Sequence, residues 1–258
     1  PGPTCAFLFA AVLSVTGPVS AQAQEAPELE ASHLSFLKAR NLGGAFMSGR
    51  ISDVAVDPTD PSTWYVTAAS GGVWKTENAG ITWRPIFDDQ ASYSIGTIAL
   101  DPQNPNIVWV GTGESCTRNS VSVGNGIYRS RDAGRTWEYL GLSESERIHR
   151  IHVHPRNPDT VYVVVDCHKA GDFTPYVIRS DNRGKSWTSI AADLPERGQI
   201  HDIVEDHVDG QLLFVGNEFG VFFTREGGEN WVQLKGDLPT IACRDLEIQR
   251  RENDLVVG

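Results

Sequence analysis

The chain has 258 residues, 40% of them hydrophobic and seven of them tryptophan, so it can bury a sizeable core as a single all-β array. Its 33 acidic and 22 basic residues give a formal net charge of −11, which excludes the basic surface that nucleic acids and anionic membranes require. We therefore expect no nucleic-acid partner.

Residues 1–24 are predicted to be a signal peptide. The apolar run 5–15 is too short to span a bilayer, and small residues follow it in the pattern of a cleavage site. A buried helix is the alternative, but Gly17 and Pro18 end the run and a polar linker follows. We expect a secreted or periplasmic protein with no membrane span after signal removal, and a linker at 25–47.

An eight-residue pattern then recurs four times, with Ser or Thr first, an acid or Asn third, Gly fifth and Trp last. The copies are 76–83, 130–137, 180–187 and 224–231, and their tryptophans lie 54, 50 and 44 residues apart. A period of this length is typical of propeller blades.

Each copy is predicted to be a tight turn between two strands. In the second copy, Asp132 can accept hydrogen bonds from its own turn, Gly134 can adopt a positive φ, and Trp137 can begin the return strand. A catalytic Asp132 is disfavoured, because a carboxylate used in its own turn is a poor proton shuttle. The turn residues expected across the copies are Asn78, Gly80, Trp83, Asp132, Gly134, Trp137, Asn182, Gly184, Trp187, Gly228 and Trp231.

The segments between these turns predict four short strands per unit. In the first unit, an alternating run at 51–56 is broken by a Pro-rich turn, resumes at 64–69, and continues at 73–75 into the octet. The expected fold class is therefore all-β, a β-propeller of four-stranded antiparallel blades. The predicted blades are 48–90, 91–143, 144–196 and 197–239, with a partial fifth at 240–258.

The partial fifth unit has two interpretations. Residues 31–47 could add a closing strand to a small ring of about five blades. Alternatively, the chain is a piece of a larger ring, which we favour because both ends of the repeat region are ragged.

The octet 130–137 resembles the Asp-box, Ser-x-Asp-x-Gly-x-Thr-Trp, of bacterial neuraminidase repeats. Across 48–258 the chain is similar to exported bacterial neuraminidase repeat proteins whose propellers resemble the luminal domain of sortilin. The segments that carry the resemblance are 48–51, 71–76, 111–114, 126–130 and 217–221. It implies an extracellular or periplasmic propeller used for binding.

Two enzyme families with similar repeats provide a test. Sialidases open on Arg-Ile-Pro, whereas Arg50-Ile51 is followed here by Ser52. Xyloglucan-specific endoglucanases place an Asp shortly before the paired glycines of the first blade, where this chain has Ala69-Ser70. We therefore expect a non-catalytic binding or scaffold module for a carbohydrate or protein partner, with no cofactor.

The candidate ligand-binding residues lie in loops that join the middle strands of a blade, the longest being 112–125 and 166–174. A polar rim could be formed by Glu114, Arg118, Asn119, His168 and Glu218. Solvated loops without a ligand are the alternative.

Two other functions stay open. The first is a sialidase-like or xyloglucanase-like glycoside hydrolase that draws a carboxylate pair from Glu114, Asp166 and Glu218. The second is a gene fragment that does not fold alone.

Three histidines, His149, His152 and His154, lie close together in the sequence. Two of them would share one face of a strand, but the spacing identifies no third ligand, so we expect no metal. Among the cysteines, Cys116 and Cys167 could pair across neighbouring repeats, with free thiols as the alternative.

Overall fold

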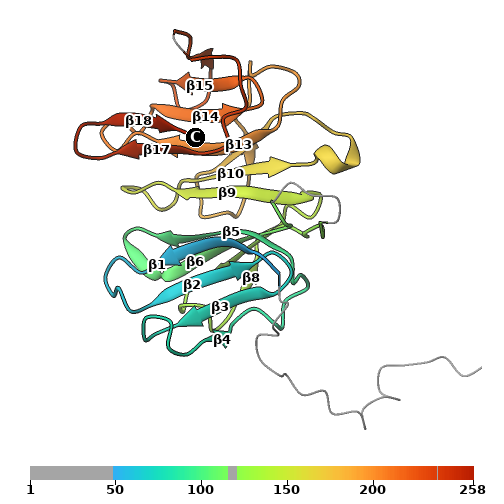
Figure 1. The fold of residues 1–258 in the computed structure, drawn as a ribbon, viewed down its shortest axis with the longest axis vertical. Helices are drawn as coiled ribbons and strands as arrows, with labels where there is room; N and C mark the ends of the chain where they lie inside the picture. The colour runs from blue at the N-terminus through green and yellow to red at the C-terminus, as the bar shows by residue number, and fades with distance from the viewer. Residues whose placement is uncertain (1–48, 116–120, 237) are drawn as a thin grey trace, which may run out of the picture. The chain divides into compact units, whose positions relative to one another are not determined.

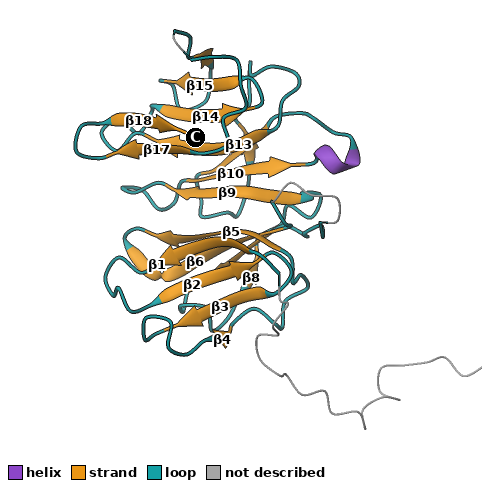
Figure 2. Cartoon of the chain, viewed as in Figure 1, coloured by secondary structure: helices purple, strands orange, loops and turns teal. Residues whose placement is uncertain are grey.

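The computed structural model describes residues 49–115, 121–236 and 238–258, all of which belong to the unit Leu42–Gly258. Over these residues the chain is all-β apart from one 3-10 helix, η2 (His168–Ala170), as Figure 2 shows. The predicted fold class is confirmed.

Several predictions lie outside the described residues. These are the signal peptide at 1–24, the linker and closing strand at 25–47, and the side chains of Cys116, Arg118 and Asn119.

The strands form four four-stranded antiparallel sheets and one two-stranded sheet, each built from consecutive hairpins (Figure 1). The first sheet contains β1 (Ile51–Val56), β2 (Trp64–Ala68), β3 (Gly72–Thr76) and β4 (Arg84–Pro85). The second contains β5 (Ile95–Asp101), β6 (Asn104–Thr112), β7 (Ile127–Ser130) and β8 (Glu138–Tyr139). The third contains β9 (Arg147–Val153), β10 (Val161–Asp166), β11 (Tyr176–Ser180) and β12 (Thr188–Ser189). The fourth contains β13 (Ile200–Glu205), β14 (Leu213–Asn217), β15 (Gly220–Thr224) and β16 (Val232–Gln233), and the fifth β17 (Leu246–Gln249) and β18 (Asp254–Val257).

The first strand of each sheet packs against the first strand of the next, in the order β1, β5, β9, β13 and β17. The sheets are therefore successive blades of a β-propeller, four complete and one partial. In the second blade, β6 starts at Asn104, directly after a tight turn in which Asp101 Oδ1 accepts the N–H groups of Gln103 and Asn104, at 2.8 and 3.2 Å.

The octets close the third and fourth strands of each blade through local hydrogen bonds. Asp132 accepts the N–H groups of Arg135 and Thr136, at 3.0 and 2.8 Å, and the hydroxyl of Thr136 at 2.7 Å. Burial raises the pKa of Asp132, but the hydrogen bonds from Thr136, Ser130 and Arg135 outweigh burial and lower it to about 2. The carboxylate thus stays ionised and holds its turn.

The first residue of every octet also stabilises the turn through its hydroxyl group. The hydroxyl of Thr76, Ser130, Ser180 or Thr224 accepts the N–H of the octet glycine at 2.9, 2.8, 2.8 and 3.2 Å respectively. This bond survives where Asn or Glu replaces the acid of the second copy, so the turn persists in all four blades.

In the second, third and fourth blades, the octet tryptophan joins its blade to the one before, whereas Trp83 of the first blade donates to the carbonyl of Gly80 in its own octet at 3.0 Å. The indole N–H of Trp137, Trp187 and Trp231 donates to the carbonyl of Ile86, Leu140 and Ile190 at 2.7, 3.2 and 2.8 Å respectively. Each acceptor lies directly after the last strand of the preceding blade, so one short sequence motif specifies both a hairpin and an inter-blade contact.

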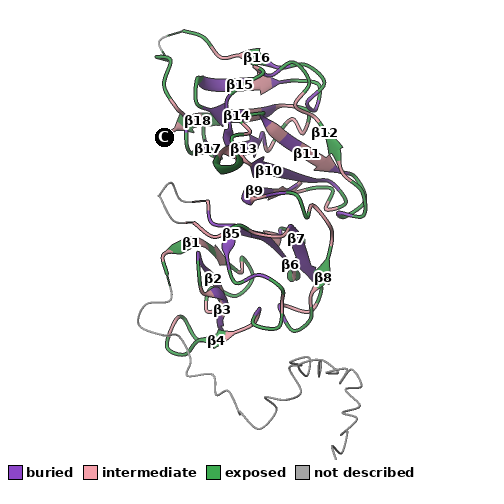
Figure 3. Cartoon of the chain, turned by 90° about the vertical axis from the view of Figure 1, so that its right-hand side faces the viewer, coloured by how far each residue is buried: buried purple, intermediate pink, exposed green. Residues whose placement is uncertain are grey.

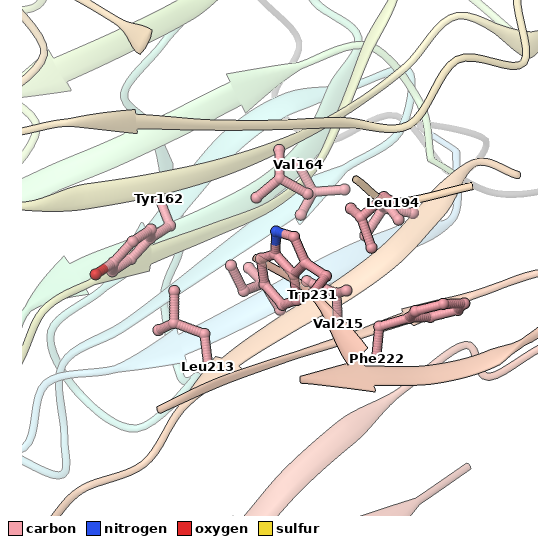
Figure 4. Packing of buried hydrophobic residues seen from close by; sticks show 10 residues of the cluster. Tyr162, Val164, Leu194, Leu213, Val215, Phe222 and Trp231 are labelled. Atoms are coloured by element: carbon pink, nitrogen blue, oxygen red, sulfur yellow. The ribbon is translucent and has the colours of Figure 1, made fainter. Parts of the chain in front are cut away.

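The hydrophobic core is divided among the spaces between blades. One cluster joins the third and fourth blades and contains Tyr162, Val164, Leu213, Val215 and Trp231 (Figure 4). Three similar clusters lie between the other neighbouring blades. Figure 3 shows the consequence, since β10 is buried whereas the outer strands β8 and β12 are exposed.

The inner strand of each complete blade carries a β-bulge near its start. The pairing register shifts by one residue there, which leaves Ser52, Gly96, His149 and His201 as the extra residues. A bulge bends a strand and redirects its side chain. In the third and fourth blades the redirected side chains are both imidazoles.

Candidate functional site

The loops after β10 and β14 lie at the same end of the sheets as the starts of β9 and β13. Antiparallel pairing requires this, because Asp166 lies opposite Arg147 and Asn217 lies opposite Ile200. Side chains from the loops and from the bulges therefore meet at this end.

Asp166 is the buried centre of one group. Its carboxylate lies 2.6 Å from His168 Nδ1 and 3.4 Å from His149 Nε2, and it accepts the N–H of His168 at 2.9 Å. Burial alone would raise the pKa of Asp166, but the contacts with His149 and His168 outweigh burial and hold it well below its usual range. Asp166 is therefore a fixed negative charge behind the two imidazoles.

Glu218 and His201 form the neighbouring pair in the fourth blade. His201 Nε2 lies 3.0 Å from Glu218 Oε1, and the Gln199 amide nitrogen lies 3.4 Å from His201 Nδ1. Burial lowers the pKa of His201, and the charges of His149 and Arg244 lower it further, against the opposing effect of Glu218. A neutral His201 that accepts from Gln199 and donates to Glu218 satisfies all three groups.

These two groups are adjacent, since the rings of His149 and His201 lie 6.0 Å apart between centroids. In front of them is a pocket of about 480 Å³. We call it the Phe219 pocket, and it is lined by His168, Phe173, Arg197, Gly198, Gln199, Glu218, Phe219 and Arg244.

Two phenyl rings make the apolar part of this pocket. Phe173 and Phe219 are 40% and 42% exposed, so both rings present apolar surface to the pocket. Gly198 fits beneath Phe219, because a Cβ at that position would lie 2.8 Å from the ring. The Gly198 N–H also donates to the Phe173 carbonyl at 2.9 Å, which ties the loop after β10 to the segment before β13.

The predicted site residues are partly brought together. His168 and Glu218 both line the Phe219 pocket, and Asp166 lies behind it. Glu114 is instead buried in the second blade, where it forms an ion pair with Arg50. Of the three predicted rim residues that the structure describes, two line the pocket and one lies elsewhere.

The other residues of the pocket, and His201 next to it, were not identified from the sequence. A signal existed for His201, because Ile148-His149 and Ile200-His201 occupy equivalent positions in consecutive inner strands. Arg197 and Arg244 lie in connections between blades, where no repeat pattern marks them.

His152 and His154 meet a third group that spacing could not reveal. Their Nε2 atoms lie 3.4 and 3.3 Å from the buried carboxylate of Glu205. His154 Nδ1 accepts the N–H groups of Arg156 and Asn157 at 3.0 and 3.2 Å, so its proton is on Nε2 and faces Glu205. In the described part of the chain, no group of three His, Cys, Asp or Glu side chains is arranged to hold a metal ion.

Two cysteines fall within the described residues. Cys167 and Cys243 are free thiols there. Burial raises the pKa of both, so neither is poised as a nucleophile. Between Gly49 and Gly258, the described residues include no helix long and apolar enough to cross a bilayer.

The Sortilin-Vps10 family model, described as "Sortilin, neurotensin receptor 3,", matches residues 125–257, just over half of the chain. The chain belongs to the Sortilin-Vps10 family. The match covers the blades that form the Phe219 pocket, so this pocket belongs to the family-related part of the chain.

This chain is also similar to xyloglucanases and to the extracellular domain of a bacterial protein. It is 22% identical over 213 residues to a probable oligoxyloglucan-reducing end-specific xyloglucanase of Neosartorya fischeri, covering 75% of this chain and 24% of that protein. An ancestral GH74 enzyme superposes with a TM-score of 0.60 at 22% identity, over 74% of this chain and 24% of the other. The extracellular domain of the putative one component system BT4673 from B. thetaiotaomicron has a TM-score of 0.58 at 15% identity, over 81% and 25%. The chain spans about a quarter of the length of the xyloglucanase it matches.

Proposed function

We propose that this chain is an exported, non-catalytic propeller module that binds a carbohydrate in the Phe219 pocket. The observation that carries the proposal is the pairing of two exposed phenyl rings with polar groups at the end of the blades. Sugar rings offer apolar faces for such stacking and hydroxyls for such polar groups. The similarity to a xyloglucanase supports a carbohydrate over a protein partner.

The carboxylates favour binding over hydrolysis. A glycoside hydrolase needs two carboxyl groups that face one cleft, one of them able to hold a proton. Asp166 is held ionised by its imidazole partners, and Glu114 is buried against Arg50. Of the three predicted acids, only Glu218 lines the pocket.

The test is a calorimetric titration of the purified full chain with two sugars. Xyloglucan heptasaccharide is the neutral sugar and trigalacturonate is the acidic one. We expect at least one of them to bind, and Phe219→Ala to weaken binding about tenfold, since a buried phenyl face contributes about 1.5 kcal/mol. Ile81→Ala is the control, because Ile81 is 82% exposed in the octet of the first blade and should leave binding unchanged.

Two results would count against the proposal. Binding of neither sugar, or binding that is insensitive to Phe219→Ala, would remove the pocket as a carbohydrate site. Release of new reducing ends from xyloglucan that Glu218→Gln abolishes would instead establish the hydrolase alternative.

A further inference from the structure

We infer that the Phe219 pocket selects a sugar that carries a carboxylate, such as a uronic acid residue of an acidic polysaccharide. The inference rests on the proposed function, because it names the class of sugar that the same pocket takes. Three features carry it: two arginines without ion-pair partners among the described residues, a cation–π contact that positions one of them, and an acceptor that is suited to hydroxyl groups.

Two exposed arginines bring positive charge to the pocket. The chain has 33 acidic residues against 22 basic ones, yet Arg197 and Arg244 both line one pocket. Neither guanidinium forms an ion pair with any carboxylate among the described residues, although many other arginines of the chain do. Unpaired guanidinium groups that face a shared pocket provide donors for a carboxylate.

Arg197 is held in position by its neighbour. Its guanidinium carbon lies 4.9 Å from the centre of the Phe173 ring, within the range of a cation–π contact. No hydrogen bond or ion pair occupies this guanidinium among the described residues, so its N–H donors are available to bind a carboxylate in two-pronged geometry. The same contact places an apolar ring beside the charge.

Arg244 reaches the pocket from the following blade. The N–H of the preceding residue, Cys243, donates to the Asn217 carbonyl at 2.9 Å, which fixes this segment against the end of β14. The positive charge of Arg244 also helps to lower the pKa of His201. The Arg244 guanidinium therefore lies close to the pair formed by His201 and Glu218.

Glu218 narrows the ligand class. One of its oxygens faces His201, so the carboxylate lines the pocket as an acceptor for hydroxyl donors. The hydroxyls of a neutral sugar can accept hydrogen bonds from the guanidinium groups but leave their two positive charges uncompensated, and a small inorganic anion has no apolar face. A carboxylated sugar uses the arginines, the phenyl rings and Glu218 together.

The experiment compares trigalacturonate with its fully methyl-esterified form, which has the same rings and hydroxyls without the charges. Calorimetry on the full chain at 50 mM NaCl should give an affinity at least tenfold higher for the acid. Raising the NaCl concentration to 500 mM should weaken binding of the acid much more than binding of the ester.

Variants locate the effect. Arg197→Gln and Arg244→Gln should each reduce the preference for the acid by about threefold or more, and the double variant should abolish it while the ester still binds. Arg225→Gln, an exposed arginine in the octet of the fourth blade, is the matched control and should change nothing.

The outcomes separate this inference from the proposed function. Equal affinities for acid and ester, both reduced by Phe219→Ala, would overturn the acidic class and leave a carbohydrate site. Binding of neither sugar would overturn both. Tighter binding of a tripeptide with a free terminal carboxylate than of trigalacturonate would also overturn the acidic-sugar inference.

Discussion

Asp202 is a buried carboxylate that joins the fourth and fifth blades. It accepts the N–H groups of Ile203 and Leu246, at 2.8 and 2.9 Å, and its Oδ1 lies 3.0 Å from Arg150 Nε. Burial raises the pKa of Asp202 to about 6, because Arg150 and the two N–H groups compensate only part of the lost hydration. This single residue should therefore make the stability of the propeller depend on pH.

The expected sign follows from proton binding. The folded chain holds the Asp202 proton up to a pH of about 6, whereas the unfolded chain releases it near its ordinary pKa of about 4. The stabilisation that Asp202 gives to the folded chain is thus complete below pH 4 and is lost as the pH rises through 6. Relative to Asp202→Asn, the free energy of unfolding of the wild type should fall by about 2 to 3 kcal/mol between pH 4 and 7.

Urea unfolding at several pH values measures this difference. Asp53→Asn is the matched control, because Asp53 has the equivalent place on β1 and accepts the Ile98 N–H at 3.0 Å but is only half-buried. A difference between wild type and Asp202→Asn that stays constant over the whole range would show that Asp202 does not titrate in this way.

At the scale of the structural element, the octet hairpin combines a conformational requirement with a packing requirement. Gly134 has a φ of +86°, and a Cβ there would lie 2.5 Å from Ile86 Cδ1 of the preceding blade. Gly141 has a nearly identical φ of +89° but no atom within 4 Å of such a Cβ. Substituting each glycine by alanine therefore distinguishes the cost of a strained backbone from the cost of a steric clash.

We expect Gly141→Ala to cost about 1 kcal/mol of unfolding free energy, from the left-handed backbone alone. Gly134→Ala should cost about 2 to 4 kcal/mol, because the methyl group also displaces Ile86. Chemical denaturation of both variants gives the comparison. Equal losses would mean that the Ile86 side chain moves aside without cost.

At the scale of the whole molecule, the core consists of separate clusters between neighbouring blades. Arrays of this kind behave approximately as a sum of unit stabilities and nearest-neighbour contacts. Damage to one interface should therefore remain local. Leu213, fully buried between the third and fourth blades, provides the test.

Leu213→Ala should cost about 2 to 5 kcal/mol at that interface. In hydrogen exchange, amides of β10 and β14 should lose protection, while amides of β2 in the first blade should keep most of theirs. Val208→Ala, at a position 65% exposed, should leave both regions unchanged. Uniform loss of protection across all blades would indicate one cooperative unit.

The blades could be predicted from the sequence because their determinants are local. The hydrogen bonds of Asp132 and Ser130 all fall within eight residues, so the octets mark their own turns. No short sequence motif marks the residues of the pocket. Phe173, Arg197 and Arg244 come from loops and connections of different lengths, and their meeting depends on how three blades pack.

The bulge in each inner strand has a further consequence. The extra residue is outside the ladder of paired strands, so its identity is free to differ from blade to blade without changing how the hairpin is aligned. Ser52, His149 and His201 are three such choices, whereas at Gly96 a Cβ would lie 2.3 Å from the Ile148 carbonyl oxygen and no larger residue fits. Three of the four complete blades thus offer a position at which the residue type can change, so the chemistry at this end of the blades can diversify while the architecture stays constant.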